Sequence, residues 1–514
     1  MFAIADHPWV DSANGAAVRI AMTVGARRDD LSLNDVPDLN ALADMNVANG
    51  RLLTVIAEKT AEEGEVAVTL TEQWGEIHAD LSVGADVTSA VALQANVNIS
   101  SPGVKLHGAG FIVTAEEAAE LGLGAQPDLA RHIREYRNGR DLTDTPRGVK
   151  VIDFFGLQAE QVRLQFPAIY QRLLERVKPE RDQNNRATYR DNWWIFGEPR
   201  RDLRPALANL TRYIATVETA KHRTFQFLDA SILPDNKLIA ITLSDAFSLG
   251  VLSSRPHTAW ALATGSWLGV GNDPVYVKSR CFETFPFPDQ DTGLTPDLRR
   301  LIANLAEQID EHRKHQQAAH PGLTLTGMYN VLEALREGRE LTTKEKTMHT
   351  QGLVAVLKEL HDELDAAVLQ AYGLQAHLGT DDLLTHLVAL NARRAAEEKT
   401  GHVRWLRPEF QNPTTASAQA AGSKQAEMPL ETPQKKKPAG KSSETGTSQV
   451  WPASLPDQVR ALALVLGSQP GVLTIADIEA RFKGRGPWKK SLPRILDTLA
   501  AVGRARREGD GWRA

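Results

Sequence analysis

The sequence predicts an α/β chain of several domains, a multidomain α+β protein, and three observations support this fold class. Its 514 residues exceed one ordinary domain, and hydrophobic residues make up 42% of them, which is enough for several buried cores. Runs rich in β-branched and aromatic residues, which are typical of strands, recur through residues 1–290. From residue 296 onward, apolar side chains recur at helical spacing instead.

The composition argues against several classes of protein. A single cysteine, Cys281, excludes an internal disulfide framework and a cysteine-based zinc site within one chain. No window approaches the apolar length of a membrane span, and the N-terminus has neither a basic leader nor a cleavable apolar core. We therefore expect a cytoplasmic protein without a membrane partner. The net charge of -5 does not exclude a nucleic-acid partner, because a local basic patch can bind nucleic acid whatever the sum.

Residues 1–92 are predicted to form only part of a sheet. The strand candidates are residues 15–24, 51–56, 66–70 and 78–81. So few strands make a poor independent core. We therefore expect an upstream segment to complete this sheet along residues 18–24.

Residues 93–290 combine strands with short helices. Strands are predicted at residues 108–113 and 149–155, a helix that Thr114 and Glu117 cap runs to Leu121, and a longer helix covers residues 158–177. The stretch 243–289 is predicted to begin as a helix through Ala263, to break at three glycines, and to resume as a strand-like run. That run ends in Phe285-Pro-Phe-Pro288.

Basic and aromatic residues alternate between residues 178 and 223, which favours contact with DNA phosphates and base edges. The candidate DNA-binding residues in this stretch are Arg181, Asn184, Asn185, Arg186, Arg190, Arg200, Arg201, Lys221 and Arg223. Asn272, Lys278 and Arg280 flank the glycine turn and are further candidates, with ordinary turn chemistry as their alternative. For the basic stretch, the alternative is a solvated surface above a core that contains Trp193 and Trp194.

The last part of the chain is predicted to be mostly helical. Residues 291–411 carry two helical patterns, 296–319 and 350–372, that fit an antiparallel spacer. Residues 412–449 are rich in polar residues and poor in aromatic ones, as in a disordered linker. Residues 450–514 show three short helices and a hairpin, the pattern of a winged helix whose third helix would present Lys489, Lys490 and Arg494 to DNA. A protein-docking module is the alternative for this domain.

Several motifs carry a resemblance to a known family. They are Asp6-His-Pro-Trp9, Gly15-Ala-Ala-Val-Arg-Ile-Ala-Met-Thr23, Arg181-Asp-Gln-Asn-Asn-Arg186, Trp193-Trp-Ile-Phe-Gly197, Lys221-His-Arg223 and the Phe285-Pro-Phe-Pro288 run. Together they resemble the C-terminal part of large bacterial class I DNA adenine-N6 methyltransferases of restriction-modification and phage-defence type, the MmeI-like enzymes. The resemblance implies that residues 1–92 end a Rossmann-like methyltransferase domain, that 93–290 form a target recognition domain, and that 291–411 form a helical spacer.

The loops that carry the chemistry of such enzymes are missing from this sequence. A Phe-x-Gly-x-Gly loop binds S-adenosylmethionine, and an Asn-Pro-Pro-aromatic loop holds the flipped adenine. The nearest segments, His107–Phe111 and Asp273–Tyr276, lack the required order or the second proline, and we interpret both as ordinary turns. His312, His315 and His320 lack the accompanying ligands of a metal site. We therefore assign no catalytic, cofactor-binding or metal-binding residue to this chain.

The resemblance implies a DNA-binding, target-recognising part of a DNA adenine-N6 methyltransferase, with duplex DNA as partner. The complete enzyme would use S-adenosylmethionine, and a methyltransferase polypeptide encoded upstream would supply the missing loops. This chain alone would then be inactive. The alternative is a non-enzymatic, sequence-specific DNA-binding module or an inactive remnant. The target sequence depends on loop geometry that the sequence does not reveal.

Overall fold

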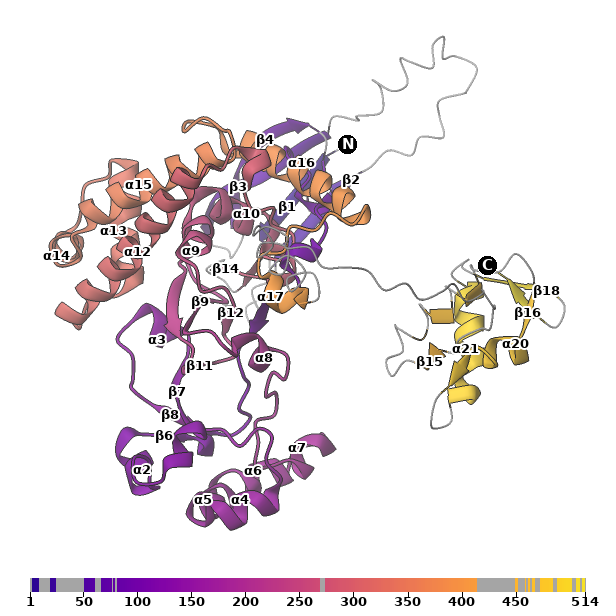
Figure 1. The fold of residues 1–514 in the computed structure, drawn as a ribbon. Helices are drawn as coiled ribbons and strands as arrows, with labels where there is room; N and C mark the ends of the chain where they lie inside the picture. Colours follow the sequence, from indigo (N-terminus) through magenta and orange to yellow (C-terminus); the bar gives the residue numbers. More distant parts are fainter. Residues whose placement is uncertain are drawn as a thin grey trace, which may run out of the picture. The chain divides into compact units, whose positions relative to one another are not determined.

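The chain folds into two compact units, residues 1–426 and 427–514 (Figure 1). The computed structural model describes residues 2–8, 19–24, 50–60, 66–75, 77–78, 81–268, 273–413, 449–451, 458, 461–462, 465–466, 472–483, 488–501, 505–508 and 511–513. Most of the predicted linker, residues 414–448, and most of residues 455–466, the first of the three short helices predicted for the C-terminal domain, therefore lie outside the described residues. Among the described residues, no helix combines the length and apolar character that crossing a bilayer requires.

The N-terminal strands form one mixed sheet. It contains β1 (Phe2–Pro8), β2 (Arg19–Val24), β3 (Gly50–Thr60) and β4 (Val66–Gly75), in the order β2-β1-β3-β4. β1 runs parallel to β3, and the other pairs are antiparallel. The predicted strand at residues 78–81 is wrong for its described residues: only Ile77 pairs, in a single bridge with Val83. The edges of the described sheet are β2 and β4.

Residues 93–290, which we call the recognition region below, contain two further four-stranded sheets. The first, in the order β10-β9-β12-β5, comprises β5 (Ser100–Pro102), β9 (Arg212–Val217), β10 (Gln226–Asp229) and β12 (Leu238–Ile241). The second, in the order β11-β7-β8-β6, comprises β6 (Ile112–Val113), β7 (Ile133–Arg137), β8 (Lys150–Ile152) and β11 (Leu233–Pro234). The short helices are α2 (Ala115–Glu120), α3 (Gly139–Thr143), α4 (Ala159–Gln165), α5 (Pro167–Arg176), α6 (Lys178–Asp182), α7 (Ala187–Asp191) and α8 (Leu203–Leu207).

Residues 106–196 form an inserted lobe within this region. The chain enters and leaves the lobe side by side, because Lys105 and Glu198 exchange two backbone hydrogen bonds of 3.0 Å. The lobe has its own aromatic core, which packs α5 against the β6-β8-β7 strands through buried residues such as Phe111, Phe154 and Phe166. We call it the inserted lobe below; it occupies the lower part of Figure 1.

Three predicted elements differ from the structure because of local backbone chemistry. The helix expected at 158–177 breaks at Phe166, just before Pro167, and continues as α5. The helix expected through Ala263 divides at Ser254 into α9 (Ala246–Ser253) and α10 (Arg255–Thr264), which has Pro256 in its first turn. Proline lacks an N–H donor and disfavours helical geometry in the preceding residue, so both breaks follow from the sequence. In the strand expected at 108–113, only Ile112 and Val113 pair, because residues 109–111 form a 3-10 turn.

The spacer helices pack onto the recognition region. They are α12 (Pro296–Ala319), α13 (Leu325–Glu337), α14 (Thr343–Gly352), α15 (Val354–Ala371), α16 (Thr380–Lys399) and the short α17 (Pro408–Gln411). α12 and α15 are antiparallel: His312 hydrogen-bonds the Gly352 carbonyl at 2.9 Å, and Thr292 donates to the Ala371 carbonyl at 2.8 Å. The helix predicted from residue 350 begins at Val354, because Leu353 adopts a left-handed φ of 42°.

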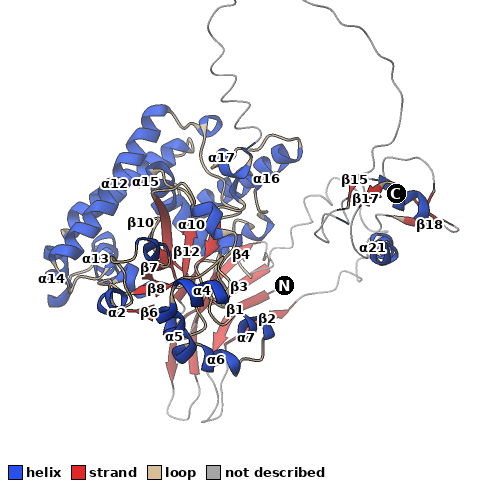
Figure 2. Cartoon of the chain, turned by 60° about the horizontal axis from the view of Figure 1, so that its bottom comes forward, coloured by secondary structure: helices blue, strands red, loops and turns tan. Residues whose placement is uncertain are grey.

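One hydrophobic core runs from the recognition sheet into the spacer. It joins buried residues of β9, β10 and β12 to those of α9, α10, α12, α13, α15 and α16. Figure 2 shows these helices grouped beside the strands. The spacer and the upper part of the recognition region therefore form one packed body rather than two separate cores.

The contact between α15 and α10 predicts a pH-dependent stability. Asp365 accepts the backbone N–H of Arg255 at 2.6 Å, and burial raises the pKa of its carboxyl from 3.8 to about 6. Between pH 3.8 and 6, the Asp365 carboxyl is therefore protonated in the folded protein but ionised in the unfolded chain. Its contribution to the free energy of unfolding rises as the pH falls through 6. We expect wild type to gain about 1 kcal/mol relative to Asp365→Asn between about pH 7.5 and pH 5. Urea unfolding of both proteins at both pH values measures this difference, and a constant difference contradicts it.

The C-terminal unit has its own small core. Its elements are β15 (Gln449–Val450), β16 (Leu473–Thr474), α20 (Ile475–Glu479), β17 (Phe482–Lys483), α21 (Trp488–Ala501), β18 (Arg506–Glu508) and β19 (Gly511–Arg513). β16, β19 and β18 form an antiparallel sheet in that order. The described part of this unit thus contains a short strand, two helices and a hairpin that pairs with that strand, and the predicted winged helix stays a prediction. Thr474 caps α20 and Asp477 completes the capping box.

Candidate nucleic-acid interface

A two-stranded hairpin projects from the recognition region after α10. It pairs β13 (Ser266–Leu268) with β14 (Asp273–Val275), where the sequence predicts a turn followed by a single strand. Its base is fixed to the end of β9, because the Tyr276 N–H donates to the Glu218 carbonyl at 2.7 Å and Thr219 bridges Val275. We call residues 266–275 the β13–β14 hairpin; residues 269–272, with the candidate Asn272, lie outside the described residues.

Arg223 holds the base of this hairpin in place. Its guanidinium donates to the carbonyls of Val217 and Pro274, the latter at 3.1 Å, and burial lowers the pKa of the group. Arg223 is half-buried and its two terminal nitrogens donate inside the protein, so its contact with DNA stays a prediction. Gly265 is required at the start of the hairpin, since a Cβ there would lie 2.6 Å from the Ala261 carbonyl oxygen.

Two apolar side chains on the hairpin face solvent. Trp267 is 56% exposed and Leu268 is 60% exposed. Leu268 also borders a groove of about 620 Å³, whose charged lining residues are Arg140, Lys221, Asp235, Lys237 and Asp273. A two-stranded ribbon fits the major groove of DNA, and an exposed aromatic ring can stack on a base. Trp267 is not among the residues predicted from the sequence; its signal is an apolar pair immediately before a glycine-rich turn, where polar residues are expected.

We expect removal of the Trp267 ring to lower the affinity for DNA and to leave the stability of the fold unchanged. Trp267→Ala is expected to weaken binding to duplex DNA about tenfold, since a base stacked on an aromatic ring contributes about 1–3 kcal/mol. Fluorescence anisotropy with labelled DNA measures the affinity. Trp74→Ala is the matched control, because Trp74 is 64% exposed on the N-terminal sheet. Equal affinities of the two variants would contradict a role for the hairpin.

The lysine side chains that line the groove, Lys221 and Lys237, remain exposed to solvent although each forms an ion pair. Lys221 lies 3.0 Å from Glu333 and is 53% exposed, while Lys237 lies 2.8 Å from Glu218 and is 63% exposed. Exposed pairs of this kind contribute little to stability, so a phosphate can replace the carboxylate at small cost. Arg140 is exposed at the N-terminal end of α3. Sequence reasoning missed Arg140 and Lys237, which only the fold brings beside Lys221.

The end of the inserted lobe and the segment that follows it hold a second group of predicted residues. Asn185, Arg186 and Arg201 are exposed, and Arg201 has no hydrogen-bond or ion-pair partner in the part of the chain that the structure describes. Arg186 donates to the Tyr189 hydroxyl at 3.0 Å. The backbone of Asn184 accepts a bond of 2.6 Å from Arg190, which orders this end of the lobe. These five residues remain predicted DNA contacts.

Two tryptophans and one arginine of the same stretch belong to the core. Trp193 and Trp194 are buried, as the structural alternative expected. Arg181 is only 1% exposed. Its guanidinium donates to the carbonyls of Leu106, His107, Tyr189 and Ile195 at 2.7, 2.5, 3.3 and 3.0 Å. The prediction that Arg181 contacts DNA is therefore wrong: it ties the entry and exit segments of the inserted lobe together.

The fold brings together two candidates that are far apart in sequence. Arg200 and Lys278 line one cavity of about 380 Å³ with Ser100, whose buried hydroxyl has no partner among the described residues. Arg200 and Lys278 each form an ion pair. Arg200 pairs with Glu198 at 2.8 Å, and Lys278 pairs with Glu283. Their charges are thus balanced, and they stay predicted contacts only. Arg280 is exposed and borders a smaller cavity of about 180 Å³ on the far side of α11 (Lys278–Cys281).

The segments nearest to the methyltransferase loops do not fit a cofactor or a flipped base. A Cβ at Gly110 would lie 2.8 Å from the Arg176 carbonyl oxygen, so this turn is packed against α5 and leaves no room for a nucleoside. Tyr276 is 1% exposed, and its hydroxyl is 2.9 Å from the buried His257. Its ring cannot stack on an extrahelical adenine in this position. Both segments are structural, so no catalytic step is assigned to them.

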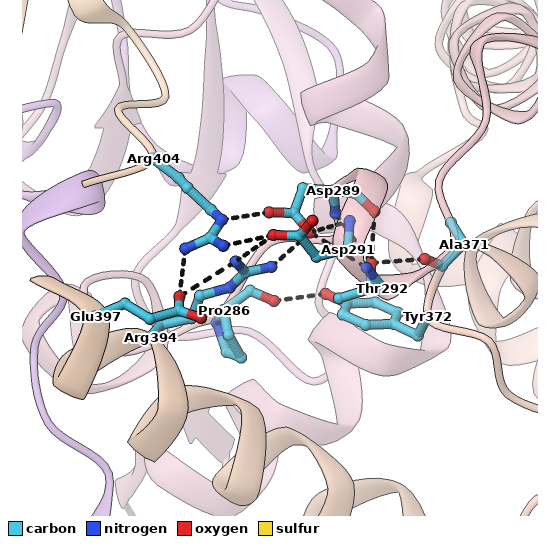
Figure 3. A network of polar contacts seen from close by, with 9 residues as sticks. All are labelled: Pro286, Asp289, Asp291, Thr292, Ala371, Tyr372, Arg394, Glu397 and Arg404. Carbon is cyan, nitrogen blue, oxygen red and sulfur yellow. Dashed lines mark hydrogen bonds and ion pairs between the residues drawn. The ribbon is translucent and has the colours of Figure 1, made fainter. Parts of the chain in front are cut away.

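A charged network closes the recognition region where it meets the spacer (Figure 3). Arg404 and Arg394 both contact Asp289, at 2.5 Å each, and Arg404 also pairs with Asp291 and Glu397. The Tyr372 hydroxyl donates to the Pro286 carbonyl at 2.8 Å. These contacts hold the Phe-Pro-Phe-Pro run against α15 and α16, so the spacer fixes the segment that follows the hairpin.

The remaining candidates lie in the C-terminal unit and on α12. Lys489 is 2.8 Å from Glu479, Arg494 is exposed, and the side chain of Lys490 lies outside the described residues. Their role in DNA binding stays a prediction. The described residues contain no group of histidine, cysteine or carboxylate side chains that could hold a metal ion.

A family model and a solved structure are similar to parts of this chain. The family model described as "MmeI, target recognition domain" matches residues 93–289. The fold resembles that of the Type IIL restriction-modification enzyme MmeI in a structure solved with DNA, with a TM-score of 0.53 and 17% sequence identity. The similarity covers 77% of this chain and 46% of that one, so this chain corresponds to less than half of the solved enzyme. No curated protein matches the sequence.

Proposed function

We propose that this chain, whose residues 93–289 form a target recognition domain of the MmeI type, recognises the target sequence for a DNA adenine-N6 methyltransferase. One observation carries the proposal. The β13–β14 hairpin presents Trp267 and Leu268 to solvent beside a groove lined by Arg140, Lys221 and Lys237. An apolar ribbon flanked by cations fits a base-pair surface flanked by phosphates.

The hairpin reads the bases, and the surrounding cations contact the phosphates. The hairpin enters the major groove, where each base pair presents a distinct pattern of donors and acceptors. The groove cations, Arg186 of the inserted lobe and Arg201 just after it contact phosphates and set the register of the protein on the duplex. Binding then weakens steeply with salt, because each phosphate contact releases condensed counterions.

The methyl-transfer chemistry is supplied by a separate catalytic part of the enzyme in the cytoplasm. That part contributes the Phe-x-Gly-x-Gly and Asn-Pro-Pro-aromatic loops, and S-adenosylmethionine supplies the methyl group when bound there. This chain contributes the position of the target adenine. The catalytic part is proposed to dock on the N-terminal sheet, along β2, an edge strand among the described residues.

The apolar side chains of this sheet support the docking proposal. The register aligns Val24, Phe2, Arg51 and Trp74 across the four strands on one face. Val24 and Trp74 are 51% and 64% exposed on that face, and Leu70 lies further along it at 38%. An exposed apolar patch at an open sheet edge is typical of an interface.

Transfer of tritiated methyl groups to mixed-sequence duplex DNA tests the proposal. This chain is assayed alone and then with the methyltransferase polypeptide encoded upstream. Incorporation only in the presence of the partner supports a divided enzyme. Trp74→Glu should then raise the partner concentration that half-maximal methylation requires.

Two outcomes would overturn the proposal. Methylation by this chain alone would mean that it contains the catalytic loops, and residues 273–276 would be mutated first. Sequence-specific DNA binding without methylation by any combination would favour a non-enzymatic specificity module instead.

A further inference from the structure

Helix α13 of the spacer borders the groove beside the β13–β14 hairpin. Thr326 of this helix lines the groove together with Lys221. Thr326, Asn330 and Glu333 recur at helical spacing, so they lie on one face of α13. Asn330 and Glu333 both contact the ammonium group of Lys221. The spacer therefore supplies one neutral and one acidic partner to a lysine of the groove.

Asn330 holds two neighbouring side chains of the recognition region with one oxygen atom. The Lys221 Nζ donates to the Asn330 Oδ1 at 2.8 Å, and the His222 Nε2 lies 2.8 Å from the same oxygen. Because lysine can only donate, the Asn330 atom is the amide oxygen, and the His222 Nε2 must carry a proton to share it. Burial lowers the pKa of His222, so at neutral pH its neutral ring has its one N–H at this nitrogen.

Glu333 forms a contact with Lys221 that a DNA phosphate would have to replace. Its carboxylate lies 3.0 Å from the Lys221 Nζ, and the two side chains are 48% and 53% exposed. A phosphate that binds the same ammonium group is repelled by this carboxylate. Asn330 carries no charge, and an ammonium group has three donors, so Lys221 can keep its bond to Asn330 while it binds a phosphate.

Buried contacts fix both sides of this arrangement. Tyr329 of α13 is 9% exposed, and its hydroxyl accepts a hydrogen bond from Arg313 at 3.1 Å. Its ring centroid lies 6.0 Å from that of His222. On the recognition side, the Ala220 N–H donates to the Pro274 carbonyl of the hairpin at 3.3 Å. The backbones are thus held in place, and only the exposed charged side chains can exchange partners.

We propose that Glu333 competes with DNA phosphate for Lys221, and that Asn330 is the positioning residue that keeps Lys221 at the groove when a phosphate displaces Glu333. The spacer thereby sets how tightly the recognition region binds a duplex of any sequence. Because Lys221 contacts DNA only under the proposed function, these roles of Glu333 and Asn330 rest on it.

Anisotropy measurements of the full chain with mixed-sequence duplex DNA, over a range of salt concentrations, test both roles. Glu333→Gln is expected to bind about threefold more tightly, because it removes a charge that repels phosphate and breaks only an exposed ion pair. Asn330→Leu is expected to bind about threefold more weakly, because Lys221 loses a hydrogen bond that orients it. Lys221→Gln should weaken binding and lower the slope of log affinity against log salt by about 1.

Double variants separate these roles from net charge and from a general effect on the fold. In the Lys221→Gln background, neither Glu333→Gln nor Asn330→Leu should change the affinity more than the control variant does. The matched control is Asp362→Asn, which removes an exposed carboxylate that pairs with Lys358 at 2.6 Å, because neither residue of this pair lines the groove.

A thermal melt shows whether Asn330→Leu is folded. If it is not, Asn330→Asp replaces it, because this variant keeps the oxygen acceptor and adds a negative charge. It should weaken DNA binding, the opposite of the effect of Glu333→Gln.

An affinity of Glu333→Gln that is equal to or below that of wild type overturns the competition, and so does an equal gain in the Lys221→Gln background. An affinity of Asn330→Leu equal to that of wild type overturns the positioning role. Lys221→Gln distinguishes these failures from a failure of the proposed function. If it binds DNA like wild type, the groove does not contact DNA and both proposals fail. If it alone weakens binding, only the roles of Glu333 and Asn330 fail.

Discussion

Arg181→Ala is expected to destabilise the inserted lobe by about 3–5 kcal/mol, because it leaves buried carbonyls without donors. The four carbonyls that Arg181 satisfies belong to the entry segment, the exit segment and α7. Lysine cannot replace this planar fork of donors, so Arg181→Lys should be almost as unstable. Urea unfolding, followed together with trypsin cleavage within residues 106–196, measures the effect.

The matched control is Arg201→Ala, because Arg201 is exposed and has no partner among the described residues. This variant should keep the stability of wild type and lose only DNA affinity. If Arg181→Ala instead unfolds like wild type while DNA binding is lost, Arg181 contacts DNA after all and does not hold the lobe together.

Arg313→Met is expected to loosen the spacer from the recognition sheet at a cost of about 3 kcal/mol, since removing one partner leaves a buried charge poorly compensated. Arg313 is 2% exposed and donates to the Tyr329 hydroxyl at 3.1 Å, to the Phe225 carbonyl at 2.6 Å and to Asp310 at 3.3 Å. His361 continues the network, 2.8 Å from the same hydroxyl. This network joins α12, α13 and α15 to the start of β10.

A double-mutant cycle decides whether the network acts as a unit. Asp310→Asn/Arg313→Met should be more stable than the sum of the two single variants predicts, because the second change removes the charge that the first leaves behind. Hydrogen exchange at Phe227, whose N–H lies 3.4 Å from Asp310, reports detachment of the sheet edge. Strict additivity of the two single effects would contradict the coupling.

Local sequence signals predicted elements well and burial poorly. The capping box predicted at Thr114 and Glu117 is present. Two helices predicted from apolar periodicity are each broken just before a proline, Pro167 or Pro256. The prolines in the sequence indicate these breaks, and the apolar periodicity does not. Helices α13 and α16 were not predicted, although both are long.

The sequence predicts which stretch of the chain contains the candidate site but not which of its residues are exposed. A basic, aromatic stretch was evident, yet Arg181 and Arg223 serve the fold, whereas Arg186 and Arg201 reach solvent. All four are arginines in similar local sequence. What separates them is tertiary packing, which places carbonyls from distant residues, Leu106 and His107 for Arg181 and Pro274 for Arg223, beside carbonyls of nearby residues. The exposure of Trp267 likewise follows from where β9 anchors its hairpin.

Selection from a randomised duplex library tests whether the β13–β14 hairpin reads DNA sequence. The full chain is equilibrated with the library, and the retained DNA is sequenced for wild type and for Trp267→Ala/Leu268→Ala. We expect wild type to enrich one sequence motif, and we expect the hairpin variant to lose this enrichment while it still retains DNA. Enrichment of the same motif by the hairpin variant, or of no motif by wild type, would contradict sequence readout by the hairpin.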